Sequence, residues 1–193
     1  INLVSPMYEA ALPSLLLSRS WGGETAMGIF STVTALATLI GSLLAVLLPA
    51  PKSRVRVVCV SLLVSMGTEN FLLAFGRNLP TWCVGAALGW LLIPVMSANL
   101  DALVRLNIPE GMQVRVYAVR NALQFFTIPV GYVLGGALVD AVFRPLMANP
   151  APWLEMLFGR DEGSGAACFY AALALMGVLT CLFFQGRKSL RTL

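Results

Sequence analysis

Long apolar segments separated by short polar connectors make up most of this chain. Four of these segments contain no charged residue, and they cover 25–51, 78–100, 121–139 and 163–186. A fifth segment, 57–76, is interrupted only by Glu69, and a sixth, 1–17, only by Glu9. Because a helix needs about 20 apolar residues to cross a hydrocarbon core about 30 Å thick, segments of this length predict membrane crossing.

The segments are apolar on every side. Membrane-spanning β-strands alternate apolar and polar residues, whereas runs such as 41–48 and 170–179 do not alternate. The pattern therefore predicts an all-α membrane protein with six transmembrane helices. They form one unit over 1–193, with spans at about 1–17, 25–48, 57–76, 81–101, 117–139 and 165–184. The first span is short and the chain begins with Ile1, so we expect the sequence to start inside a span.

Composition narrows the classes of function. Of the 193 residues, 58% are hydrophobic and 11% are charged, whereas about 25% of the residues in soluble domains are charged. This excludes an ordinary cytosolic domain, a disordered chain and a nucleic-acid binder. The absence of histidine excludes Ser-His-Asp or Cys-His catalysis and zinc binding by histidine. Since the cysteines also lack metal or redox spacing, we expect no metal, no cofactor and no enzymatic activity.

Basic residues gather on alternate connectors. Nine of the thirteen lie in 52–56, 101–120 and 187–193, and the intervening connectors hold only four. Such an excess marks the cytoplasmic side. We therefore expect a multi-pass protein of the inner (plasma) membrane whose C-terminus is cytoplasmic, and an even number of spans places the N-terminus on the same side. The connector 142–164 then lies outside, where we expect 152–158 (PWLEMLF) to form a short interfacial stretch.

Ionisable residues inside predicted spans are candidates for function, because burying charge in a membrane is costly. Glu9, next to Tyr8 in the first span, has no basic residue within one helical turn. Its carboxyl group can carry a proton or bind a cationic substrate, unless it lies near the outer surface and is simply hydrated. Glu69 is a secondary candidate, because the neighbouring Asn70 can hydrogen-bond it in a purely structural role.

Polar residues near the ends of the later spans complete the candidates. Asn99, Asn121 and Gln124 are further candidates for a polar cavity. Asp101 and Asp140 lie near the membrane surfaces, where a structural role is the simpler interpretation. We expect Asp101 to pair with a basic residue of the same connector, which offers Arg105, Arg115 and Arg120.

Helix breakers and small residues predict bent and closely packed helices. Pro94 and Pro129 fall in the middle of the fourth and fifth spans, where each removes a backbone hydrogen bond and permits bending. Small residues stand four apart in the same spans, which lets helices approach closely. They are Gly85 and Gly89, and Gly131 and Gly135 with Gly136 following. Ordinary membrane packing is sufficient to explain the first pair.

The segment 92–140 resembles the tenth and eleventh spans of a major facilitator superfamily transporter, closest to the macrolide-efflux-like drug exporters. Its Ile-Pro, Gln-x-Arg-Val (113–116) and Pro-x-Gly-x-x-x-Gly-Gly (129–136) series carry the resemblance, and 1–24 resembles the outer part of the seventh span. The resemblance covers almost the whole chain. It implies the C-terminal six-helix half of a twelve-helix carrier. One departure is Val114, which stands where the family usually has glycine.

The resemblance also implies roles. In this family the first, second, fourth and fifth spans of the half face the central cavity, which ranks Tyr8, Glu9, Asn99 and Gln124 above Glu69 and Asn70. Asp101, Arg105 and Arg115 would belong to an inner gate. The implied activity is proton-coupled efflux, by antiport, of drug-like amphipathic small molecules by alternating access.

The implied partners are the lipid bilayer, the small-molecule substrate, and a separate N-terminal half or a second copy of the chain. The alternative is a non-transporting half-carrier remnant or assembly partner, because half of a carrier cannot enclose a two-sided cavity.

Overall fold

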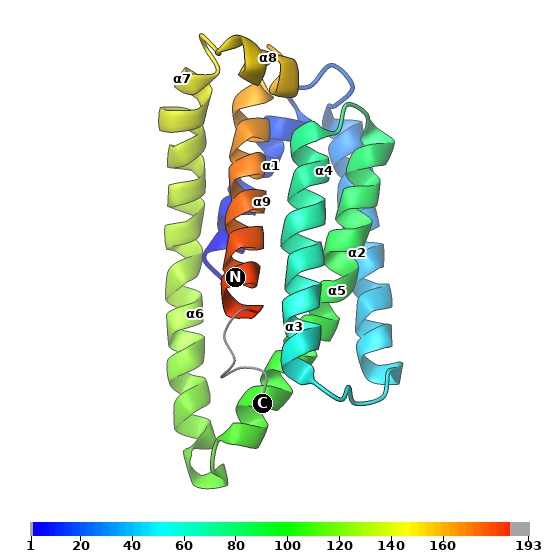
Figure 1. Ribbon diagram of the computed structural model, residues 1–193, viewed down its shortest axis with the longest axis vertical. Coiled ribbons are helices and arrows are strands. Elements are labelled where there is room, and N and C mark those ends of the chain that lie inside the picture. The colour runs from blue at the N-terminus through cyan, green and yellow to red at the C-terminus, as the bar shows by residue number, and fades with distance from the viewer. Residues whose placement is uncertain (1, 186–193) are drawn as a thin grey trace.

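The computed structural model describes residues 2–185, and within this range every regular element is helical, with no β-strand. Figure 1 shows the arrangement. The elements are α1 (Val4–Leu16), α2 (Glu24–Leu47), α3 (Arg54–Leu62), the π-helical segment η1 (Leu63–Glu69), α4 (Asn70–Phe75), α5 (Leu79–Asn107), α6 (Glu110–Leu138), the π-helical segment η2 (Val139–Phe143), α7 (Arg144–Leu146), α8 (Pro152–Phe158) and α9 (Ser164–Gln185). The basic tail 187–193 lies outside the described residues.

Five helical segments are long and apolar enough to cross a membrane. They are Glu24–Leu47, Arg54–Phe75, Leu79–Asn107, Glu110–Leu146 and Ser164–Phe183. The prediction of an all-α chain is therefore confirmed for the described part, and its five long apolar helices are compatible with a membrane protein. The sixth predicted span corresponds to α1, which has 13 residues and thus a length of only about 20 Å. The number six stays a prediction.

The connector after the fourth predicted span is shorter than expected. The spans predicted to end at 101 and to begin at 117 continue as helix, so that only Ile108 and Pro109 separate α5 from α6. Hydropathy detects the part of a helix that lies in hydrocarbon, whereas the charged turns beyond it remain helical in water. Because proline has no backbone N–H, it cannot donate the hydrogen bond that would continue α5. The break between the two helices therefore falls at Pro109.

Local sequence signals explain where other helices begin. Asn78 caps α5, because its side-chain oxygen accepts a hydrogen bond from the backbone N–H of Thr81 at 2.9 Å. Ser53 caps α3 in the same way, with the N–H of Arg56 at 3.3 Å. Asparagine and serine are preferred at this position because they satisfy otherwise unpaired N–H groups.

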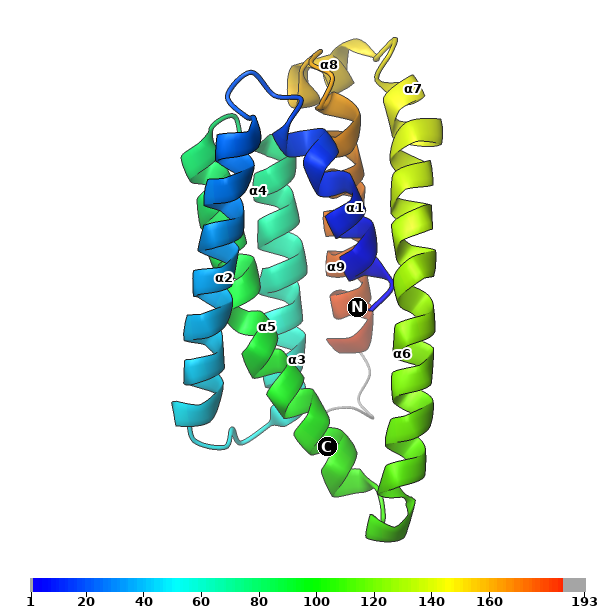
Figure 2. The same ribbon diagram turned by 180° about the vertical axis from the view of Figure 1, so that it is seen from behind.

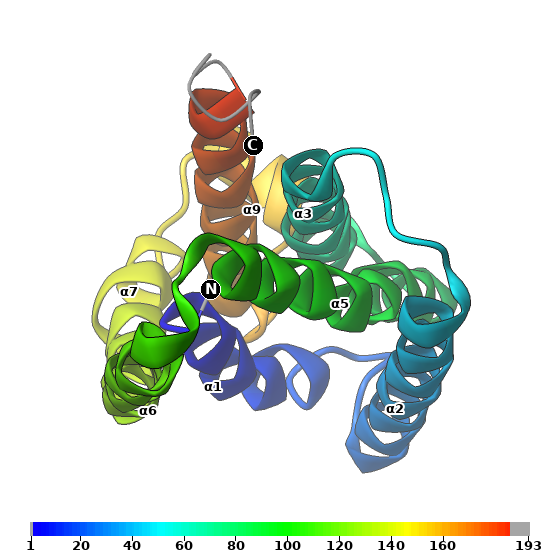
Figure 3. The same ribbon diagram turned by 90° about the horizontal axis from the view of Figure 1, so that it is seen from below.

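The helices are arranged around α5. Seen from below, α1, α2 and α6 lie on one side of α5, and α3 and α9 lie on the other (Figure 3). The α2–α3 and α5–α6 connections lie at one end of the bundle, and α8 lies at the opposite end (Figures 1 and 2). Half of the most apolar stretch of α9 is buried, but only 17% of the corresponding stretches of α2 and α6. These two outer helices therefore expose most of their apolar surface.

Glycine allows α1 to lie directly against α6. A Cβ atom on Gly131 would stand 2.5 Å from the carbonyl oxygen of Leu3, and one on Gly135 would stand 2.6 Å from the Cα of Met7. A Cβ atom on Gly136 would have no neighbouring atom within 4 Å. Pro94 and Pro129 lie inside α5 and α6, and both helices continue past them. A hinge at either proline stays a prediction.

The end that carries α8 is tightly packed. The helix has the bounds of the predicted PWLEMLF stretch. Beside it, the buried Arg19 donates to the Asp161 carboxylate and to the backbone oxygen of Phe158, both at 3.0 Å. Its guanidinium also lies over the Trp21 ring, 5.6 Å from the centroid. One side chain thus connects the α1–α2 loop to the segment before α9.

Candidate functional site

A groove of about 620 Å³ runs between α1, α2 and α5. Apolar and aromatic side chains form much of its wall, together with one carboxyl group and several hydroxyl groups. The lining residues with polar atoms are Tyr8, Glu9, Ser31, Thr34, Thr38, Ser42 and Trp90. No arginine or lysine belongs to the described residues that line it. Its volume is that of a site for a small organic molecule.

The hydroxyl groups on α2 form a stripe along the groove. Thr34, Thr38 and Ser42 each donate a hydrogen bond of 2.8 Å to the backbone oxygen four residues earlier. Because each hydroxyl proton is used in this way, the lone pairs of the oxygen remain available as acceptors. With Glu9 the groove is therefore rich in acceptors, which favours a ligand that brings a positive charge or hydrogen-bond donors.

Glu9 lies at the surface of the groove. Its side chain is exposed, and its Oε2 accepts a hydrogen bond from the hydroxyl of Tyr132 on α6. Tyr132 is itself 43% exposed. The Glu9 carboxyl therefore bridges α1 and α6 while remaining open to a ligand or to water.

Tyr8, the preceding residue, is directed into the protein. Its hydroxyl donates to Oε1 of Glu69 at 2.6 Å, and the Nε1–H of Trp90 donates to the same oxygen at 2.9 Å. Glu69 is only 5% exposed. Tyr170 on α9 completes the cluster, because its hydroxyl donates to the backbone oxygen of Tyr8 at 2.7 Å. We call Tyr8, Glu69, Trp90 and Tyr170 the buried cluster.

Gly89 makes room for the Glu69 carboxyl. A Cβ atom at this position would stand 2.0 Å from Oε2 of Glu69, closer than atoms can approach. One of the small residues assigned to ordinary packing therefore accommodates the acidic side chain. Glu69 also ends the π-helical segment η1 (Leu63–Glu69). Such segments are rare in helices and are frequent at functional sites.

Asn70 does not hydrogen-bond Glu69. Its Nδ2 donates to the backbone oxygen of Met66 at 2.6 Å, and its buried Oδ1 has no partner in the described part of the chain. The structural role considered for Asn70 toward Glu69 is therefore wrong. The resemblance ranks Glu69 low because it places the third span away from the cavity. The structure turns this side chain inward, toward α1 and α5.

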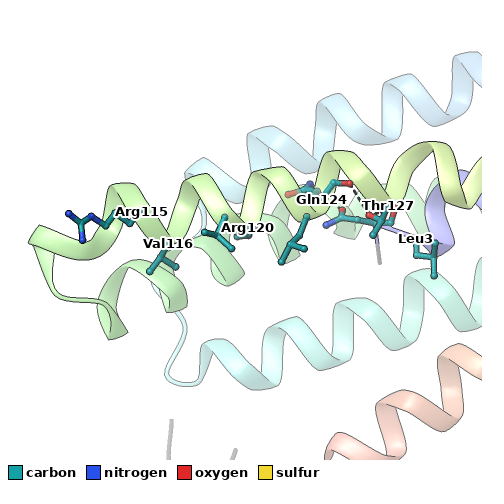
Figure 4. A pocket seen from close by; sticks show the side chains of 9 residues that line it. Leu3, Arg115, Val116, Arg120, Gln124 and Thr127 are labelled. Atoms are coloured by element: carbon teal, nitrogen blue, oxygen red, sulfur yellow. Dashed lines mark hydrogen bonds between the residues drawn. The ribbon is translucent and has the colours of Figure 1, made fainter.

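A second groove, of about 750 Å³, lies along residues 115–127 of α6 and is shown in Figure 4. Gln124 and Arg115 line it, and Gln124 donates to the side-chain oxygen of Asn2 at 3.1 Å. Arg115 is exposed, and so is Asn121, which is not among the lining residues. Gln124 therefore lines this second groove, whereas neither of the two predicted acids, Glu9 and Glu69, does.

The predicted inner-gate residues have separate surroundings. Asp101 pairs with Arg120 at 2.5 Å, so the expectation of a basic partner is confirmed and Arg120 is that partner. Arg105 is exposed, and its backbone oxygen accepts from Gln113. Asn99 is buried, donates to the Val95 oxygen and accepts from Arg54 at 3.3 Å. Asn99 therefore lies apart from the groove that Glu9 lines.

Sequence reasoning named Tyr8, Glu9 and Glu69 but missed three of their partners. Trp90, Tyr132 and Tyr170 supply hydrogen bonds to these residues or to their backbone. Aromatic residues with a polar tip need a partner when they are buried in an apolar environment. That rule was the available signal for Trp90 and Tyr170, although it cannot say which partner each residue finds.

Comparison of the chain with protein-family models, with curated proteins and with solved structures finds no match.

Proposed function

We propose that this chain is the C-terminal six-helix half of a major facilitator superfamily carrier that exports amphipathic small molecules in exchange for protons. The observation that supports the proposal most directly is the groove between α1, α2 and α5, with Glu9, hydroxyl acceptors and aromatic walls. An organic cation with an apolar body fits this chemistry, because its charge meets the carboxylate while its body packs on aromatic and aliphatic side chains.

The groove has an open side, which fits a transporter half that faces a second half. Large apolar side chains on α2 and α6 are exposed, such as Leu39 at 59%, which lines the groove, and Phe126 at 70%. In the proposed carrier, lipid and the N-terminal half cover these surfaces. Rocking of the two halves then exposes the groove alternately to the two sides of the membrane.

The test is efflux of the fluorescent cation ethidium from energised cells. Cells express the chain alone or together with a matched N-terminal half, and each culture is measured with and without a protonophore. We expect extrusion only from the complete pair, and we expect the protonophore to stop it. If the pair is present in the membrane and extrudes no dye, the export of organic cations is wrong.

The second candidate is an assembly partner that does not transport. The exposure of α2 and α6 favours it as well, because two copies of the chain can cover the same faces. The chain alone then forms a dimer in detergent. Analytical ultracentrifugation of the purified chain distinguishes a dimer from a monomer that requires a different half.

A further inference from the structure

Among residues 2–185, Glu69 is a buried acid without a cationic partner. Its side chain belongs to the buried cluster, and none of the ion pairs within residues 2–185 includes it. Burying a carboxylate is costly unless it is paired or hydrogen-bonded. Two donors, Tyr8 and Trp90, offset part of this cost. Binding a proton would remove the charge altogether.

The described groups around Glu69 are neutral, so a proton is the cation that can neutralise its charge. Helix α1 contributes the Tyr8 hydroxyl, α5 contributes Trp90 and the space at Gly89, and α9 contributes Tyr170 behind Tyr8. In the part of the chain that the structure describes, the titratable neighbours are therefore two tyrosines. Glu9, which follows Tyr8 on α1, accepts a hydrogen bond from Tyr132 on α6 instead.

The two donors also connect Glu69 to the groove. Tyr8 and Trp90 hydrogen-bond Oε1 of Glu69, and both of them line the groove. The carboxyl itself is not among the lining residues. A proton that enters or leaves Glu69 from this side therefore passes Tyr8, whose hydroxyl is both a donor and an acceptor.

We propose that Glu69 is the proton-exchange site of this protein and that Tyr8 relays the proton between it and the groove. In the uptake step, Tyr8 gives its hydroxyl proton to Oε1 of Glu69 and accepts a proton from a hydronium ion in the groove, which is left as water. The tyrosine is unchanged, Glu69 becomes neutral, and one proton has moved. The reverse step returns the proton to the groove. The part that this exchange plays in transport rests on the proposed function.

The test follows the carboxylic acid directly. Infrared difference spectra of the purified chain in lipid nanodiscs are recorded over a range of pH, and the carbonyl stretching band of a protonated acid is measured. Nine acidic side chains contribute to these spectra, so the band of one acid is identified by comparing variants. We expect one titrating band of the unaltered chain to be lost in Glu69→Gln and kept in Glu9→Gln. Glutamine keeps the size of the side chain and an oxygen for Tyr8 and Trp90, so this variant preserves the packing.

A matched pair of tyrosine variants tests the connection. Tyr8→Phe removes a donor to Glu69, and we expect the pH midpoint of the band to move by about one pH unit, a tenfold change in proton affinity. Tyr132→Phe removes the corresponding donor to Glu9 and should leave the band where it was. Its midpoint in Tyr8→Phe is read against the midpoint in the unaltered chain.

Two results would overturn the proposal. One is a Glu69→Gln variant that keeps every titrating band of the unaltered chain, and the other is a midpoint that Tyr8→Phe leaves unmoved. Neither result depends on dye transport. A complete pair that exports no ethidium contradicts the proposed function, whereas the infrared spectra decide the assignment of Glu69 on their own.

Discussion

Two adjacent residues of α1, Tyr8 and Glu9, each take part in a tyrosine–glutamate hydrogen bond, but with different parts of the protein. The pair Tyr8–Glu69 is buried, with exposed fractions of 6% and 5%. The pair Tyr132–Glu9 connects α6 to α1 at the surface of the groove. The same two functional groups therefore meet in opposite environments. Burial makes the first pair sensitive to any lost partner, while the second can exchange its partner for water or for a ligand.

This comparison separates two roles that the sequence assigned together to Glu9. A carboxylate that a ligand can reach is suited to binding a cation, which describes Glu9 in the groove. A buried carboxylate that belongs to none of the described ion pairs is suited to holding a proton, which describes Glu69. Variants of the two pairs therefore provide controls for each other.

Removal of the two carboxyl groups should give the largest difference. We expect Glu69→Ala to lower the free energy of unfolding by about 2–5 kcal/mol, because it leaves the buried Tyr8 hydroxyl and the half-buried Trp90 indole unpaired and creates a cavity. Glu9→Ala, at an exposed site, should change it by no more than about 0.5 kcal/mol. Thermal unfolding in detergent measures both. Equal losses would contradict the difference between the two environments.

The glycine that faces Glu69 comes next. Gly89→Ala places a methyl group where the carboxyl lies, and we expect a loss of about 1–3 kcal/mol through overpacking. Gly136→Ala is the control, because Gly136 is helical and has open space around it. Alanine there should stabilise the protein by about 0.5–1 kcal/mol, since glycine is a poor helix residue. A stabilising Gly89→Ala would show that the Glu69 carboxyl occupies another position.

The tyrosine hydroxyls should show a smaller contrast. Tyr8→Phe removes one of two donors to a buried carboxyl, and we expect a loss of about 1–2 kcal/mol. Tyr132→Phe removes a donor from an exposed carboxyl that water can replace, so we expect less than about 0.5 kcal/mol. Chemical unfolding followed by tryptophan fluorescence gives both values. A larger effect from Tyr132→Phe would reverse the comparison.

The smallest effect on stability, and the most specific effect on binding, belongs to a conservative change in the groove. Glu9→Gln removes the negative charge but keeps an oxygen for Tyr132, so stability should change by less than about 0.5 kcal/mol. We expect the affinity for ethidium to fall about tenfold, because a charge-assisted contact is lost. Fluorescence titration of the purified chain measures the affinity. Glu110→Gln, which removes an exposed acid outside the groove, should leave the affinity nearly unchanged.

The sequence predicted the helices better than the contacts between them. Runs with no charge, or with a single one, identify apolar helices from composition alone. Most ends of the five long spans were therefore predicted to within a few residues. The ends at Asn107 and Glu110 were wrong because charged helical turns carry no hydropathy signal. Prolines and capping residues mark those boundaries more reliably.

The candidate site was predicted only in part for a different reason. Glu9 and Glu69 stand out in the sequence, because each is an acid in an apolar run. The partner of Glu69 on α1 is 61 residues away, and Tyr170 is 162 residues from Tyr8. Helical periodicity says which residues share a face, but not which face meets which across such distances. The inward direction of Glu69 therefore required the three-dimensional structure.

The short helix α1 has a consequence for synthesis of the protein. Its polar contacts reach forward along the chain, from Tyr8 to Glu69 and Tyr170, and Arg19 in the loop that follows α1 reaches Asp161. Among the described helices, α1 is therefore made well before the residues that complete its polar contacts. Until α9 emerges, Tyr8 lacks the hydroxyl group of Tyr170, and α1 depends on the insertion machinery or on lipid to hold it in place.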